Sequence, residues 1–141
     1  MKAKAYLMQI QKLDLMIENK MAEKARFQGM ARNTSPSYGG ERVQTTRNPH
    51  RMEDAICDYI DIDREIDRRI DEFVDTKNKI IQIIEKLDAS EYDLLHKHYV
   101  QYMDLQVIAD KKGKSYSWAT SLHGLALKHV QVILDRENIE E

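Results

Sequence analysis

Residues 104–120 read DLQVIADKKGKSYSWAT, and this stretch decides the fold that we expect. It begins as a short amphipathic helix, whose buried face is expected to contain Val107, Ile108 and Ala109. Gly113 can adopt the positive φ that ends a helix, and Ser115 can cap the next helix by accepting a hydrogen bond from a free backbone N–H. The stretch therefore predicts a helix-turn-helix, a motif whose second helix usually enters the DNA major groove.

The composition favours long helices. The 141 residues include only 5 glycines and 2 prolines, so few positions break a helix. The single cysteine, Cys57, excludes an intramolecular disulfide, and a reducing compartment is the default expectation. The sequence shows no signal-peptide core and no apolar run long enough to span a bilayer. We therefore expect a cytoplasmic protein with no membrane partner.

The charge is distributed unevenly along the chain. The net charge is −2, but residues 1–50 carry 9 Lys/Arg against 4 Asp/Glu, whereas residues 51–87 carry 7 against 11. Non-specific DNA-binding proteins usually have a clear basic excess over the whole domain. Local groups of lysines would therefore have to make the phosphate contacts.

The first half of the chain divides into a helix and a linker. Residues 1–30 predict a basic amphipathic helix, because apolar side chains recur every three or four residues at Tyr6, Ile10, Leu13, Ile17 and Met21. Residues 31–50 hold both prolines and two of the five glycines, and they predict a flexible linker.

A long coiled-coil helix is expected over residues 51–88. Eleven positions there step by four and three, and nine of them are apolar. Since the first helix is basic and this one acidic, an antiparallel hairpin of the two is expected. The apolar face is wide enough to contact a second chain as well. The residues expected to hold an oligomer together are Ile56, Tyr59, Ile66, Ile70, Phe73, Ile80 and Ile84.

Residues 89–134 predict a three-helix domain that contains the helix-turn-helix. Its first helix is expected to begin at Ser90, and residues 135–141 form an acidic tail. The buried stripe expected on the last helix consists of Ala119, Leu122, Ala126, Val130 and Ile133. The fold class is therefore all-α: a long helical hairpin or coiled coil, followed by a C-terminal helix-turn-helix domain.

The remaining face of the last helix and the turn before it form the predicted DNA interface. Lysines there suit phosphate contacts, and hydroxyl groups near the helix N-terminus can reach bases or phosphates. Gly124 would allow the backbone to come close, whereas Trp118 is expected at the edge of the core. The predicted DNA-binding residues are Lys111, Lys112, Lys114, Ser115, Tyr116, Ser117, Thr120, Ser121, Gly124 and Lys128.

No pattern in the sequence indicates an enzyme, a metal site or a cofactor. His96 and His98 lie two residues apart on a helix and so point in different directions. His123 and His129 lack a second ligand at metal-binding spacing. The acidic residues between Asp58 and Asp75 alternate with arginines, as is typical of a solvated, salt-bridged helix face. Phosphate-binding glycine loops and nucleophile motifs are not found.

Residues from about Ser90 to Leu134 resemble region four of sigma-70-type factors. The resemblance rests on Ile108-Ala109, on the turn Gly113-Lys114-Ser115 and on Ala126-Leu127 in the last helix. Together with the long preceding helices, this domain is similar to the small late-gene transcription regulators of phages that infect Gram-positive bacteria, the ArpU/RinA type. The resemblance implies a phage or prophage protein in the bacterial cytoplasm that activates late genes.

The sequence leaves three functions open. The first is a transcription regulator that binds promoter or operator DNA as a homo-oligomer, with a dimer favoured. The second is a packaging protein similar to a small terminase, for which a ring of about eight or more subunits would be expected. The third is a protein-interaction module that acts on RNA polymerase. Failure to bind any DNA, whatever the salt concentration, would favour the third.

Overall fold

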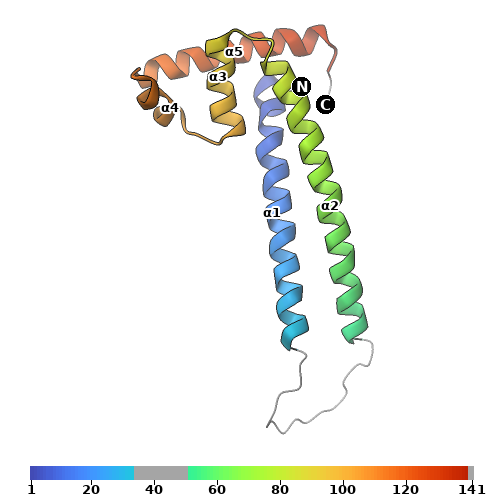
Figure 1. Cartoon of the computed structure of the whole chain (residues 1–141). Coiled ribbons are helices and arrows are strands. Elements are labelled where there is room, and N and C mark those ends of the chain that lie inside the picture. Colours follow the sequence, from blue (N-terminus) through green and yellow to red (C-terminus); the bar gives the residue numbers. More distant parts are fainter. Residues whose placement is uncertain (34–50, 140–141) are drawn as a thin grey trace. The chain divides into compact units, whose positions relative to one another are not determined.

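The computed structural model describes residues 1–33 and 51–139, and every regular element in these ranges is helical. Figure 1 shows the elements in chain order. They are α1 (Ala3–Asn33), α2 (Arg51–Ile84), α3 (Ala89–Leu95), a π-helical segment η1 (His96–Val100), α4 (Leu105–Lys112) and α5 (Tyr116–Arg136). The all-α prediction is confirmed. Of the predicted linker, residues 31–33 belong to α1, and residues 34–50 lie outside the described residues.

The chain divides into two compact units. Unit 1 combines Met1–Asp14 with Glu72–Glu141, and unit 2 is Leu15–Asp71. The predicted helix-turn-helix segment, 89–134, is therefore part of a larger unit that also includes the first turns of α1 and the last turns of α2.

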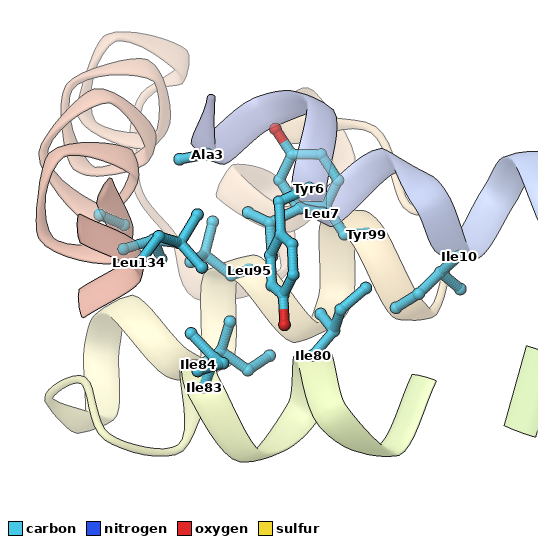
Figure 2. Packing of buried hydrophobic residues seen from close by; sticks show 12 residues of the cluster. Ala3, Tyr6, Leu7, Ile10, Ile80, Ile83, Ile84, Leu95, Tyr99 and Leu134 are labelled. Carbon is cyan, nitrogen blue, oxygen red and sulfur yellow. The ribbon is translucent and has the colours of Figure 1, made fainter. Parts of the chain in front are cut away.

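Unit 1 is held together by a core to which helices far apart in sequence contribute. Figure 2 shows α1 and α2 meeting the C-terminal helices around this cluster. Its buried members are Ala3, Tyr6, Leu7, Ile10, Ile80, Ile83, Ile84, Leu95, Tyr99, Ala126, Val130 and Leu134. Fully burying one leucine or isoleucine contributes about 1.5–3 kcal/mol, so this cluster dominates the stability of unit 1.

The N-terminal end of α1 is fixed to α5 by one side chain. The Gln131 Oε1 atom accepts a hydrogen bond of 2.7 Å from the backbone N–H of Ala3. The Gln131 amide also donates to the Met1 carbonyl oxygen over 3.2 Å. The first N–H groups of a helix have no partner inside that helix, so Gln131 satisfies one of them from another element.

A second, smaller core supports the helix-turn-helix. Its buried members are Leu94, Ile108, Ala109 and Ala119, with Met103, Leu105, Trp118 and Leu122 packed at its edge. This confirms the expected position of Trp118. Val107, predicted to be buried, is 42% exposed. The apolar stripe of α4 is instead formed by Leu105, Ile108 and Ala109, whose spacing of three and four places them on one side of the helix.

Two further predictions about the C-terminal helices need correction. α3 begins one residue before Ser90, because the Asp88 side chain caps it by accepting the Glu91 N–H at 3.0 Å. On α5, Leu134 was not expected in the buried stripe, yet it is 1% exposed, whereas Ile133 is only half-buried. Leu134 packs against the first core, which contains residues from α1 and α2.

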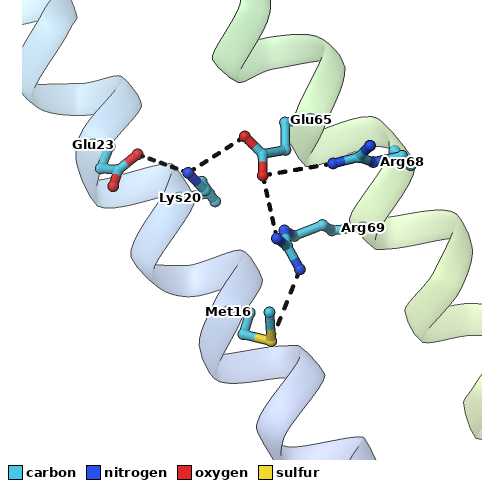
Figure 3. Close-up of polar contacts among 6 residues, drawn as sticks. All are labelled: Met16, Lys20, Glu23, Glu65, Arg68 and Arg69. Atoms are coloured by element: carbon cyan, nitrogen blue, oxygen red, sulfur yellow. Dashed lines mark hydrogen bonds and ion pairs between the residues drawn. The ribbon is translucent and has the colours of Figure 1, made fainter.

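Unit 2 is a pair of helix segments joined by ion pairs. The Lys20 ammonium lies 3.2 Å from Glu23 and 3.3 Å from Glu65, as Figure 3 shows. The hydrogen bond from Lys20 lowers the pKa of Glu65, and Arg69 acts in the same direction. Lys24 forms a further ion pair with Asp63 at 2.6 Å. The expected complementarity of a basic first helix and an acidic second helix is confirmed.

The oligomer prediction for α2 has to be corrected. Ile66, Ile80 and Ile84 are at most 5% exposed, because other helices of the same chain cover them. They were expected to contact a second chain, and their burial within one chain prevents this. Of the other residues in that prediction, Tyr59 and Phe73 are half-buried, whereas Ile56 and Ile70 are exposed.

No helix in the described parts of the chain is long and apolar enough to cross a membrane.

Candidate nucleic-acid interface

The turn between α4 and α5 has the conformation that the sequence predicts. Gly113 ends α4 in the left-handed region, with φ 67° and ψ 31°. The next residue, Lys114, donates its backbone N–H to the Ala109 carbonyl oxygen at 2.9 Å. Ser115 then begins α5, because its hydroxyl accepts the Trp118 N–H at 3.0 Å. Both predictions for this turn, a glycine with positive φ and a serine cap, are confirmed.

All ten residues predicted to contact DNA are exposed. Ala119, Ala126 and Val130 bury one side of α5, so the polar residues lie on the opposite side. Gly124 lies among them, and a Cβ atom built there would meet nothing within 4 Å. The Thr120 hydroxyl donates to the Ser117 carbonyl oxygen at 3.0 Å, so its free lone pair can act only as an acceptor. The exposed side of α5 is therefore polar and sterically open from Ser117 to Gly124, whereas Leu125 and Val132 make its later turns partly apolar.

The charge of this region differs from that of the chain as a whole. From Lys111 to Leu134 the sequence contains four lysines and no aspartate or glutamate, although the net charge of the whole chain is −2. Asp110, just before this stretch, accepts a hydrogen bond of 2.9 Å from the Gln106 side chain. A stretch with several lysines and no acidic residue favours contact with polyanions, because close contact with phosphate releases counterions.

Lys112 has a structural role that sequence reasoning missed. Its ammonium group forms an ion pair with Asp93 of α3, which also binds Lys97. The hydrogen bond from Lys112, followed by that from Lys97, lowers the pKa of the Asp93 carboxyl. Lys112 thus ties α4 to α3. Within the described residues, Lys111 and Lys114 have no such ion pair, and they remain available for phosphate groups.

A buried carboxylate below the interface was also missed. Glu91 is 2% exposed, and both of its carboxylate oxygens lie 2.7 Å from the Nδ1 atom of His129 on α5. The sequence indicated no second metal ligand for His129 and did not indicate Glu91 as its partner. The two residues are 38 positions apart. The one signal in the sequence is that Glu91 stands three and four residues before the apolar Leu94 and Leu95, which places an acid on the apolar side of α3.

A tyrosine and two histidines pack together where η1 meets α5. The Tyr99 hydroxyl lies 2.7 Å from Nε2 of His123, and the His98 and His123 rings are 5.3 Å apart. Burial raises the pKa of Tyr99 to about 12. Burial, and then the nearby His98 and Lys4, lower the pKa of His123. Tyr99 therefore donates to a neutral His123 at neutral pH. Over the described ranges, 1–33 and 51–139, no three His, Cys, Asp or Glu side chains gather as around a metal ion.

The segment between η1 and α4 is held in an unusual backbone conformation. Tyr102 has φ 58°, a value that non-glycine residues seldom adopt. Its hydroxyl donates a hydrogen bond of 2.8 Å to Asp14 of α1, and burial together with this carboxylate raises the pKa of Tyr102. This contact links the start of the helix-turn-helix to α1.

Comparisons of this chain with protein family models, with curated proteins and with solved structures found no match.

Proposed function

We propose that this chain binds double-stranded DNA, with α5 as the recognition helix and the α4–α5 turn on the phosphate backbone. One observation carries the proposal: the Gly113 turn and the Ser115 cap leave a polar surface exposed on the N-terminal turns of α5, in a stretch without acidic residues. A helix-turn-helix presents the N-terminal part of its second helix to the major groove in this way.

The residue types on that side suit two kinds of contact. Lys111, Lys114 and Lys128 would contact phosphate groups, which fixes the orientation on the duplex without reading the sequence. Ser117 and Ser121 would reach base edges as donors or acceptors of hydrogen bonds, and Thr120 as an acceptor. Gly124 would permit close approach of the helix backbone.

The biological role that we propose is transcription regulation. By the resemblance to region four of sigma-70-type factors, the DNA target would be a promoter or operator of phage or prophage late genes, and RNA polymerase would be a further partner. A dimer would suit this task, because two half-sites bound together add binding energy without any new contact.

The decisive experiment is a selection of bound fragments from the source genome, followed by salt-titrated binding of the selected fragment. A single upstream site bound at least about a thousandfold more tightly than random DNA would support a sequence-specific regulator. Recovery of no fragment at low salt would contradict DNA binding.

The role of the lysines can be tested with a matched pair of double variants. Changing Lys111 and Lys114 to alanine should reduce the slope of log K against log salt by about 1.8, because each lost phosphate contact accounts for about 0.9. The control changes Lys12 and Lys79, which are exposed lysines outside the interface, and it removes the same charge. Equal slopes for the two double variants would exclude Lys111 and Lys114 from the interface.

A protein-binding role is the second candidate, and one observation favours it. Leu125 is 47% and Val132 51% exposed, and their spacing of seven residues places them on the same side of α5. Exposed apolar side chains in this arrangement are typical of a surface that contacts another protein. Retention of RNA polymerase on the immobilised chain, lost in Leu125→Asp together with Val132→Asp, would support this candidate if the genomic selection fails.

A further inference from the structure

The starting observation is that unit 2 buries very little apolar surface. Within its described residues, only Ile17 and Ile66 are buried hydrophobic residues. A pair of helices with so small a core is not stable by itself in water, since helical stability comes mainly from packing of an apolar face. Large apolar side chains nevertheless remain exposed in this unit: Leu15, Met21, Ile56, Ile60 and Ile70.

Three of these residues lie on one side of α2. Ile56 and Ile60 are one turn apart. Tyr59 and Asp63, each three residues further along α2, both contact α1. Ile70 follows Asp63 by seven residues, which returns it to the same side of the helix. Their exposed fractions are 48%, 44% and 39%. α2 therefore carries three uncovered isoleucines beside its contact with α1, with Asp63 and Asp67 between Ile60 and Ile70 on the same side.

The contacts between the helices show which part of α1 faces the same way. The pairs Gln28–Tyr59 and Lys24–Asp63 lie along one edge of the helix pair, and Lys20–Glu65 lies along the other. Met21 lies three residues before Lys24, and Ala25 lies three residues before Gln28. Both therefore lie next to the first of these two edges. Both are exposed, Met21 to 55%.

The opposite side of unit 2 is mainly charged. A cavity of about 590 Å³ there is lined by four charged side chains and by Phe27 and Ile62. The charged members are Glu23, Arg26, Asp58 and Asp61. Charged groups around an open cavity remain hydrated, so the apolar side is the one that lacks a cover.

The charges of α1 and α2 indicate which partner could cover the exposed apolar residues of unit 2. Residues 15–33 of α1 carry four Lys/Arg and two Asp/Glu, whereas residues 51–71 of α2 carry four Lys/Arg and eight Asp/Glu. A basic helix with exposed apolar side chains would complement this side of α2, and α1 of this chain has both properties. A two-fold axis parallel to the helices would place α1 of each copy on α2 of the other, so each opposite-charge contact would occur twice.

We propose that the side of unit 2 formed by Met21, Ala25, Ile56, Ile60 and Ile70, here named the apolar side, binds the same side of a second copy of this chain. Each basic α1 segment packs against the acidic α2 segment of the other copy, and four antiparallel neighbours form a bundle. This extends the dimer of the proposed function, and its test uses the protein without DNA, so either proposal can fail alone.

The experiment measures the mass of the full chain in solution at about 100 μM by light scattering, together with the dissociation constant. Wild type is expected near twice 16.6 kDa. Ile60→Lys should weaken the dimer at least about tenfold, because it places a charge in the apolar side and against a basic helix. Leu15→Lys is the control: Leu15 is 49% exposed in the same unit, but it lies two residues from Ile17 and so on the far side of α1.

Salt separates this arrangement from the alternative in which α2 packs on α2. Basic-on-acidic packing predicts a dimer that weakens when NaCl is raised from about 0.05 to 0.5 M, whereas acidic-on-acidic packing predicts one that tightens. Circular dichroism of each variant confirms that it is still folded. A monomeric wild type, equal effects of Ile60→Lys and Leu15→Lys, or a dimer that tightens with salt would each overturn the proposal.

Discussion

The two glycines of the helix-turn-helix provide a pair of substitutions with opposite expected effects. Gly113 has φ 67°, a conformation that costs an ordinary L-residue roughly 1–2 kcal/mol. A Cβ atom added at either Gly113 or Gly124 would meet nothing within 4 Å. The difference between the two sites is therefore due to the backbone and not to packing.

The magnitudes follow from that backbone difference. Gly113→Ala should lower the free energy of unfolding by about 1 kcal/mol, since part of the left-handed cost is offset by the reduced entropy of the unfolded chain. Gly124→Ala should raise it by about 0.5–1 kcal/mol, because Gly124 lies inside α5, where alanine is the better helix former. Gly113→Asn should cost less than Gly113→Ala, because asparagine tolerates positive φ.

Urea unfolding followed by circular dichroism can resolve these effects. With a slope of about 2 kcal/mol per M, 1 kcal/mol moves the midpoint by about 0.5 M. Gly124→Ala should also weaken DNA binding while it stabilises the fold, since the added methyl group lies on the proposed recognition side. A neutral Gly113→Ala or a destabilising Gly124→Ala would refute the reasoning from backbone conformation.

Three more predictions concern other parts of unit 1. Leu134→Ala should cost about 2–5 kcal/mol of unfolding free energy, whereas Leu125→Ala, at an exposed position of the same helix, should cost less than 1 kcal/mol. Because the folded-state pKa of His123 is lowered, its contribution to stability is present above the unfolded value of 6.5 and is lost as pH falls below it. Thermal melts at pH 7.5 and 5.5 should show this loss, and Tyr99→Phe should reduce it by removing the donor to His123. Ser115→Ala should lower the free energy of unfolding by about 1 kcal/mol, because the helix cap is lost. Ser115→Asp should keep most of the wild-type stability, because aspartate also caps helices. Equal unfolding midpoints for the two variants would contradict a capping role.

Local features of the fold could be predicted from the sequence because their causes are local. The Gly113 turn and the Ser115 cap depend on residues within a few positions of one another. The start of α3 was misplaced by one residue because Ser90 and Asp88 are both good capping residues, and the side chain that accepts the Glu91 N–H decides between them.

Features that depend on distant residues could not be predicted. Ile80 and Ile84 fit a coiled-coil seam between chains as well as they fit an intrachain core, and only the position of the C-terminal helices decides that they are buried. Likewise, Lys112 was assigned to phosphate because periodicity does not show that Asp93 lies beside it. The pattern places residues on a face, but it does not say which helix covers that face.

The Gln131 contact has a consequence for synthesis of the protein. Ala3 and Gln131 are 128 positions apart, and Leu7 and Ile10 are buried in the same core. At about 5–20 residues per second, a ribosome needs roughly 6–25 s to add the residues between Ala3 and Gln131. During this time the apolar residues of α1 lack the helices that bury them. The first core of unit 1 can therefore be completed only after α5 has been synthesised.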